Sequence, residues 1–152
     1  MRQVYLKPGD YLIDEVDVGL VSTILGSCVA VILWHPKSKA YCICHYLLAG
    51  EPGDSGGRYG HWILNEFRRW AVGHGFKPED VEAMITGGAG SMQASLLAER
   101  FQVGSCNYHL AQQFISEAGF HLRQEDVGGN SGRKVIFNPP SGKLTIQLLS
   151  GV

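Results

Sequence analysis

Two apolar runs separated by a short polar segment constrain the fold of this 152-residue chain more than any other feature. The runs cover residues 29–34 and 40–48, and both are rich in the aliphatic and aromatic side chains that strands favour. The segment between them contains Pro36, which suits the first central position of a turn. Because strands joined by so short a connection pair in antiparallel orientation, the sequence predicts a β-hairpin.

Similar patterns account for the rest of the chain. Further strands are expected at residues 18–24, 81–85, 120–122, 134–137 and 144–149, and the last two form a second hairpin. Apolar residues at helical spacing predict one helix over residues 61–74, ended by Gly75. A second helix begins with Ser105 as its N-cap and ends at Gly119. The expected fold class is α/β: one compact domain, residues 1–152, of mixed and largely antiparallel β layers packed with two main helices.

Composition excludes several classes of protein. Hydrophobic residues make up 45% of the chain and charged residues 18%, so a core can form and disorder is not expected. The formal net charge of −1 gives no electrostatic reason to expect a nucleic-acid partner. No apolar run approaches the roughly 20 residues of a membrane span, and Pro8, Gly9 and Asp10 are unlike a signal peptide. We therefore expect a cytoplasmic protein without membrane insertion, whose four cysteines are reduced.

The predicted hairpin brings a thiol and an imidazole together. Cys28 follows a Gly-Ser pair at the start of the first strand, where a lone cysteine is more often a small core residue than a reactive one. If the turn is centred between residues 36 and 37, Cys28 lies directly opposite His45. If it is centred one residue later, Ala30 takes that place and Cys28 becomes a diagonal neighbour on the same face. In either register, an imidazolium beside the thiol would lower the pKa of the thiol and favour the reactive thiolate.

Neither a metal site nor a cofactor site is predicted. Cys42 and Cys44 precede His45 closely, but successive strand residues point to opposite faces, so both cysteines face away from the histidine. The sequence has no second ligand cluster of the kind that zinc sites use, and the two cysteines are expected to pack between layers. Residues 87–90, Gly-Gly-Ala-Gly, lack the lysine of a phosphate-binding loop and are expected to form a structural turn.

Cys28 lies within the segment Leu-Gly-Ser-Cys-Val-Ala-Val of residues 25–31, and His45 follows seventeen residues later, before Leu47 and Leu48. This arrangement resembles the chemoreceptor glutamine deamidase family, CheD. The resemblance covers almost the whole chain and extends to Arg58-Tyr59, to Thr-Gly-Gly-Ala at 86–89, to Glu-Asp-Val-Gly-Gly-Asn at 125–130 and to Gly-Arg-Lys-Val at 132–135. The combination is specific, although no single piece is.

The resemblance implies a three-layer α/β/β fold and a triad like that of cysteine proteases. By position, Cys28 is the nucleophile and His45 is the base. The third member is usually a hydroxyl residue six positions before the cysteine, which is Ser22 here; Thr23, which alternation directs to the other face, is the alternative. His61 and Cys106 stand where the family often has an acidic residue and an arginine, and these departures could alter the preference for substrate or partner.

The implied activity is hydrolysis of specific glutamine side chains on the cytoplasmic helices of chemoreceptors to glutamate, with release of ammonia, in chemotaxis adaptation. The resemblance also implies a complex with a CheC-type phosphatase. The alternative function is that of a non-catalytic docking regulator of that phosphatase or of the receptors. The pairing of a thiol with an imidazole favours catalysis, because a pure docking protein has no need of it.

Overall fold

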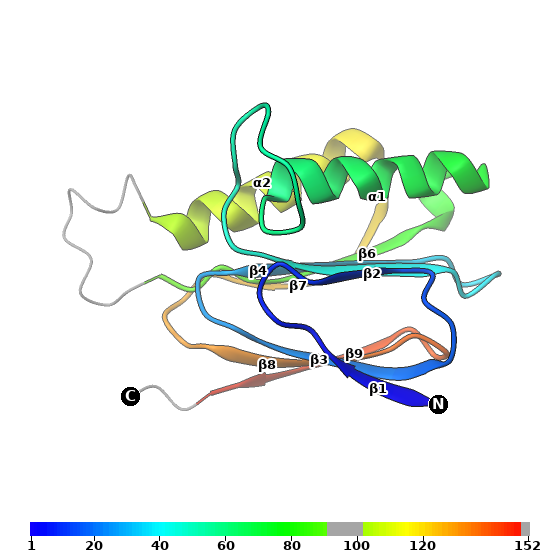
Figure 1. Ribbon diagram of the computed structural model, residues 1–152, viewed down its shortest axis with the longest axis horizontal. Coiled ribbons are helices and arrows are strands. Elements are labelled where there is room, and N and C mark those ends of the chain that lie inside the picture. The colour runs from blue at the N-terminus through cyan, green and yellow to red at the C-terminus, as the bar shows by residue number, and fades with distance from the viewer. Residues whose placement is uncertain (91–101, 150–152) are drawn as a thin grey trace.

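A computed structural model describes residues 1–90 and 102–149 of the chain, which form three stacked layers (Figure 1). The outer sheet has the strand order β1-β3-β8-β9, with bounds Arg2–Tyr5, Val18–Leu25, Arg133–Asn138 and Lys143–Leu148. The central sheet has the order β2-β5-β4-β6-β7, with bounds Tyr11–Ile13, Tyr41–Tyr46, Val29–Trp34, Glu82–Gly87 and His121–Val127. Helices α1 (Gly60–His74) and α2 (Val103–Ala118) cover the face of the central sheet that is turned away from the outer sheet. A short 3-10 turn, η1, spans Pro78–Asp80. The α/β class, with two helices and largely antiparallel layers, is confirmed.

The central sheet is buried on both faces, which explains the unbroken apolar runs in β4 and β5. On one face, Val31, Cys42 and Cys44 join the core beneath the helices. On the other face, Ala30 and Ile43 join the core between the two sheets. Both cysteines are therefore packing residues on the opposite side of the sheet from the inter-sheet space, as the alternation of side chains predicts.

The first hairpin is confirmed as an antiparallel pair, β4 with β5, and so is the second, β8 with β9. Both helices end as predicted, because Gly75 and Gly119 adopt left-handed backbone angles, with φ of 73° and 79°. The N-cap assigned to Ser105 was wrong. Helix α2 begins at Val103, and the hydroxyl of Ser105 lies within its first turn and donates to the carbonyl of Gln102.

Three strand segments carry too weak a pattern to be found from the sequence. Strands β1 and β2 have four and three residues, and most of their side chains are exposed or half-buried. Strand β7 extends to Val127 through Arg-Gln-Glu-Asp. It is an edge strand without fully buried side chains, so its sequence shows no apolar pattern. Two of these strands form the parallel pairs of the fold, β1 with β3 and β7 with β6.

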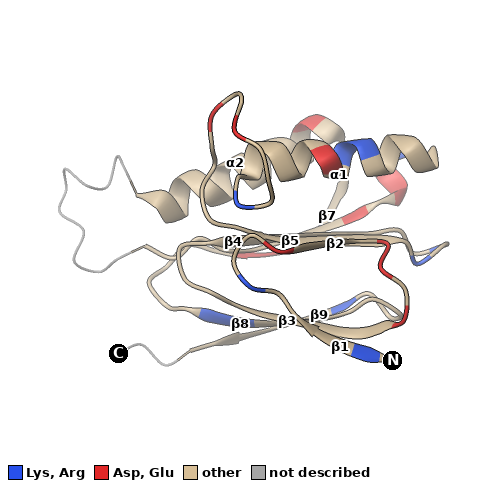
Figure 2. Cartoon of the chain, in the orientation of Figure 1, with Lys and Arg blue, Asp and Glu red and all other residues tan. Residues whose placement is uncertain are grey.

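Charged residues of both signs occur in the described part of the chain (Figure 2). In the outer sheet, β1, β8 and β9 contain Arg or Lys, and none of the four strands contains Asp or Glu within its bounds. Acidic residues occur on α1, on β7 and in the connecting loops. No helix among residues 1–90 and 102–149 is long and apolar enough to cross a membrane. The distribution fits a chain whose acidic and basic residues nearly balance, at a net charge of −1.

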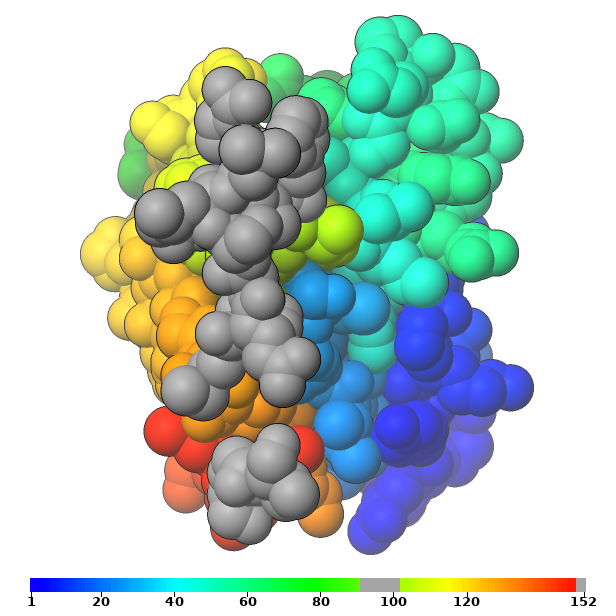
Figure 3. All heavy atoms as spheres, turned by 90° about the vertical axis from the view of Figure 1, so that its left-hand side faces the viewer, coloured from blue at the N-terminus to red at the C-terminus, as the bar shows by residue number. Residues whose placement is uncertain are grey.

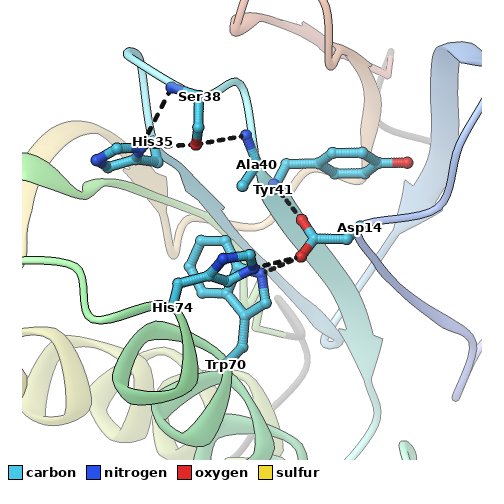
Figure 4. A network of polar contacts seen from close by, with 7 residues as sticks. All are labelled: Asp14, His35, Ser38, Ala40, Tyr41, Trp70 and His74. Carbon is cyan, nitrogen blue, oxygen red and sulfur yellow. Dashed lines mark hydrogen bonds and ion pairs between the residues drawn. The ribbon is translucent and has the colours of Figure 1, made fainter.

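One carboxylate ties the end of α1 to the central sheet (Figure 4). Oδ2 of Asp14 accepts a hydrogen bond of 2.9 Å from the indole of Trp70 and lies 2.7 Å from Nε2 of His74. Oδ1 of Asp14 accepts the backbone N–H of Tyr41 at 3.0 Å. Because all three partners are N–H groups, the site needs a side chain that only accepts hydrogen bonds.

We expect Asp14→Asn to lower the free energy of unfolding by about 1–3 kcal/mol, because an amide NH₂ would replace one acceptor and face a donor. Asparagine tolerates the positive φ of 49° at this position, so backbone strain does not confound the result. The matched control is Asp80→Asn, since the Asp80 side chain makes no hydrogen bond to the described residues. Urea unfolding measures both variants, and equal midpoints for the two would contradict the prediction.

Candidate active site

Cys28 lies in the turn between β3 and β4, and glycines hold this turn in place. The N–H groups of Gly88 and Ala89 donate to the carbonyls of Cys28 and Gly26 at 2.9 and 3.0 Å. A Cβ on Gly87 would collide with the carbonyl of Cys28, and the φ of 110° there also favours glycine. The glycine-rich segment therefore acts as a structural turn that supports the cysteine, and the thiol itself is half-buried.

His45 lies on β5, opposite Ala30 of β4, which confirms the second of the two predicted registers. Cys28 is thus a diagonal neighbour of His45, a relation that places Cβ atoms roughly 7–8 Å apart. Both side chains lie on the face of the hairpin that is turned toward the outer sheet, where Cys28 packs against the inter-sheet core. The imidazole is 1% exposed, and its Nε2 atom has no hydrogen-bond partner among the described residues.

A hydroxyl group from the outer sheet orients the imidazole. Oγ1 of Thr23 lies 2.7 Å from Nδ1 of His45 and 2.8 Å from the carbonyl oxygen of Leu6. The hydroxyl has one proton, and the carbonyl can only accept it, so Oγ1 must accept a hydrogen bond from Nδ1–H. This assignment leaves Nε2 as an unprotonated base.

The contact that the resemblance implied for Ser22 is therefore made by Thr23. Val21, Thr23 and Leu25 are fully buried and point toward the central sheet, whereas Ser22 and Ile24 lie on the outer face of β3. No hydrogen bond of the Ser22 side chain occurs within the described residues. The sequence contained the signal for this choice, because alternation places Thr23 on the same face as the apolar Val21 and Leu25.

The connection between β1 and β2 fixes the backbone of His45 on both sides. Gly9 N–H donates to the carbonyl of His45 at 2.7 Å, and His45 N–H donates to the carbonyl of Asp10 at 3.1 Å. Leu6, which anchors Thr23, belongs to the same connection. Sequence reasoning missed this support, because it consists of main-chain contacts from a segment with no clear pattern.

Burial changes the protonation of the base and the thiol. It lowers the pKa of His45 to about 4, although the nearby Asp10 acts in the opposite direction. Burial also raises the pKa of the Cys28 thiol, and the backbone N–H of Cys28 offsets this only in part. At pH 7 the imidazole is therefore neutral and does not supply the positive charge that the sequence led us to expect. The resting pair is therefore neutral rather than a standing ion pair, and transfer of the thiol proton to the ring has to accompany the attack of the sulfur.

Two backbone N–H groups next to the thiol have no acceptor on any other residue that the structure describes. The N–H groups of Ser27 and Cys28 make no hydrogen bond to any described residue. The N–H of Cys28 approaches its own sulfur closely enough to favour the thiolate. Free N–H groups at this position can stabilise an oxyanion that forms next to the sulfur.

Asn107, a residue of α2 that sequence reasoning did not select, contacts the backbone just before β4 and just after β5. Its side chain is fully buried, and Nδ2 donates to the carbonyls of Ser27 and Leu47 at 2.9 and 2.7 Å. Its own backbone carbonyl accepts the hydroxyl of Tyr46. A buried asparagine on an otherwise apolar helix face was the available sequence signal.

The two departures from the family pattern lie at different places. Cys106 is exposed beside Asn107 and lines a groove of about 320 Å³ between α2 and residues 48–59. His61 lines a separate groove of about 180 Å³ between the two helices. In Figure 3, the turn with Cys28 (blue), the start of α2 (yellow-green) and the segment after β5 (cyan) meet on one face of the molecule. Cys106 therefore adjoins Asn107, whose side chain contacts the turn that carries Cys28.

The structure contains no group of three or more His, Cys, Asp or Glu side chains within residues 1–90 and 102–149 that could hold a metal ion. Cys42 and Cys44 are fully buried among apolar side chains, and burial raises the pKa of both thiols. The candidate site therefore consists of a half-buried thiol, an oriented neutral imidazole and two backbone donors that have no acceptor elsewhere in the described part of the chain. Such a set can attack a carbonyl group and stabilise the resulting oxyanion.

Residues 49–148 match the family model described as CheD chemotactic sensory transduction. A relative from Chromobacterium violaceum, named probable chemoreceptor glutamine deamidase CheD 1, is 34% identical over 95% of this chain and 76% of its own length. A probable chemoreceptor glutamine deamidase from Geobacter sulfurreducens is 33% identical over 99% and 92%. The chemoreceptor glutamine deamidase of Thermotoga maritima is 30% identical over 94% and 90%.

Among solved structures, the hypothetical protein YfiH of Bacillus licheniformis is similar in fold, with a TM-score of 0.50. The similarity covers 77% of this chain and 49% of YfiH, at 15% sequence identity. At that identity, the likeness concerns the arrangement of layers alone.

Proposed function

Because the chain belongs to the CheD family of chemotactic sensory transduction proteins, we propose that it hydrolyses glutamine side chains of chemoreceptors to glutamate. In this proposal Cys28 is the nucleophile, His45 is the base and Thr23 orients the base. One observation carries it: Thr23 holds the His45 ring so that a free Nε2 lies on the face of the hairpin that carries the thiol. The names of the relatives supply the substrate class, chemoreceptor glutamine.

The reaction follows from these positions. Nε2 of His45 takes the thiol proton while Sγ of Cys28 attacks the carboxamide carbon, and the N–H groups of Ser27 and Cys28 bind the oxyanion. The imidazolium then gives its proton to the departing amine, so ammonia leaves and a thioester remains. Because burial lowers the pKa of this ring to about 4, the transient imidazolium is a strong acid toward the leaving group. Nε2 next deprotonates a water that attacks the thioester, which releases glutamate and restores the thiol.

The test is incubation of the protein with a chemoreceptor cytoplasmic fragment in water labelled with heavy oxygen. We expect peptide mass spectrometry to find specific glutamines converted to glutamate, each with one labelled oxygen, because water hydrolyses the thioester. A parallel incubation without the protein corrects for spontaneous deamidation. Conversion no faster than in that control would contradict the proposed activity.

The proposal extends to partners and location that the resemblance implies. These are the cytoplasmic helices of the receptors as substrate, a CheC-type phosphatase as a partner and the cytoplasm as the compartment. The docking-only alternative predicts binding to the receptor fragment or the phosphatase with no conversion of glutamine. Co-sedimentation of the same mixtures, beside mass spectrometry, separates the two functions.

Thr23→Val is expected to lower kcat/KM by about 10- to 100-fold, the equivalent of about 1.4–3 kcal/mol for a buried hydrogen bond to the base. Valine keeps the shape of threonine but cannot accept the proton of Nδ1. Ser22→Ala is the matched control, since this neighbouring hydroxyl lies on the outer face of β3, and it should leave kcat/KM nearly unchanged. A large loss in Ser22→Ala with none in Thr23→Val would assign the orienting role to Ser22 instead.

A further inference from the structure

We propose that Asn107 is a positioning residue for the proposed reaction, acting by holding the backbone next to Cys28 and the backbone next to His45 at a fixed separation. The inference rests on the proposed function, because it assigns a task in that chemistry. Both hydrogens of the Asn107 amide are used, one toward Ser27 and one toward Leu47. One rigid side chain therefore joins the segment that carries the nucleophile to the strand that carries the base.

The position of these two carbonyls explains why a bridge is needed. The ladder between β4 and β5 ends at the pair Val29 and Tyr46, so Ser27 and Leu47 both lie beyond the last pair. Neither carbonyl accepts another hydrogen bond from the described residues. At the end of the hairpin where Cys28 lies, the two hydrogen bonds of Asn107 therefore take the place of further strand-to-strand hydrogen bonds.

The anchor is itself held firmly against the supporting turn. A Cβ on Gly104, in the first turn of α2, would collide with the carbonyls of Gly88 and Ala89. That same segment donates to the carbonyls of Gly26 and Cys28. The start of α2 is therefore pressed against the segment that supports the cysteine, and a shift of the helix would be transmitted to the thiol.

The Asn107 side chain uses its two N–H donors but not its oxygen acceptor. Its Oδ1 atom is buried and has no partner among the described residues. An unpaired buried acceptor is unfavourable for folding, by about 1–3 kcal/mol. An apolar side chain would avoid that cost, but it would leave the carbonyls of Ser27 and Leu47 without a donor. The amide therefore contributes through its two N–H groups.

The test uses the alkylation rate of Cys28 by iodoacetamide, followed by peptide mass spectrometry, together with kcat and KM for deamidation. Asn107→Leu should slow alkylation and lower kcat by about 10- to 100-fold, with little change in KM, because small misplacements of reacting groups cost this much. The matched control is Tyr46→Phe, which removes the hydrogen bond to the backbone carbonyl of Asn107 but keeps both Nδ2 bonds. Tyr46→Phe should leave both rates nearly unchanged even where it lowers stability. Asn107→Ser, a small polar replacement, serves if the leucine variant does not fold, and the same losses are expected from it.

A double-mutant cycle separates positioning from a general structural role. If Asn107 acts by aligning Cys28 with His45, Asn107→Leu should slow alkylation no further in a His45→Gln background. Losses that multiply in the double variant, or a folded Asn107→Leu or Asn107→Ser protein with wild-type kcat and alkylation, would overturn the inference. Absence of deamidation in the wild type would instead overturn the proposed function, and the alkylation cycle distinguishes that outcome from failure of the inference alone.

Discussion

Cys28→Ala should abolish conversion of receptor glutamine, with a loss of at least about 10⁴-fold in kcat, because no thioester can form without the sulfur. Among the remaining cysteines, Cys42 and Cys44 cannot substitute, since both are fully buried on the helix side of the central sheet. The rate to measure is glutamine-to-glutamate conversion by mass spectrometry, at enzyme concentrations high enough to detect single turnovers.

Cys106→Ala is the matched control for that loss. Cys106 is exposed and lines the groove next to Asn107, so it is the thiol with which Cys28 is most easily confused in a labelling experiment. It should be alkylated in the native protein, yet its replacement should leave conversion nearly unchanged. If Cys28→Ala retained activity and Cys106→Ala lost it, the nucleophile would have to be reassigned to α2.

The sequence was sufficient to place Cys28 and His45 together, because hairpin pairing and alternation are local rules. Both possible registers put Cys28 and His45 on one face, and the structure selects the register in which Ala30 lies opposite the histidine. The same alternation turned Cys42 and Cys44 away from His45 correctly.

Local rules could not predict the tertiary contacts that hold Cys28 and His45 in place. Alternation directs Thr23 to the apolar face of β3, but its contact with His45 exists only because the two sheets pack face to face. Asn107 reaches the hairpin from a helix 60 residues farther along the chain than Leu47. The neutral state of His45 likewise follows from its burial, which depends on the assembled layers. Sequence patterns located Cys28 and His45, whereas tertiary packing determines their orientation and protonation.

His45→Gln should lower kcat by about 10²- to 10⁴-fold, because glutamine can neither take the thiol proton nor return it to the leaving amine.

The pH dependence of the wild type should identify how the base works. Since burial lowers the pKa of His45 to about 4, deamidation should persist as the pH falls through 6.5, the ordinary value for histidine, and decline only near pH 4. Alkylation of Cys28 should instead rise with pH beyond the ordinary range of a thiol, because burial raises the pKa of that thiol. A flat alkylation rate from pH 5 to pH 8 would contradict the neutral pair, since it would reveal a thiolate–imidazolium pair.

Protein stability offers a second measurement of the same protonation state, independent of catalysis. Between pH 6.5 and about 4, the unfolded chain binds a proton at His45 and the folded protein does not, so the free energy of unfolding should fall as the pH falls through this window. The fall attributable to His45 should be about 3 kcal/mol across the window, and the slope should be correspondingly smaller in His45→Gln. Urea unfolding of the two proteins at matched pH gives that difference directly. Equal slopes would mean that the His45 ring takes up its proton over the same pH range in the folded protein as in the unfolded chain, which would contradict the lowered pKa.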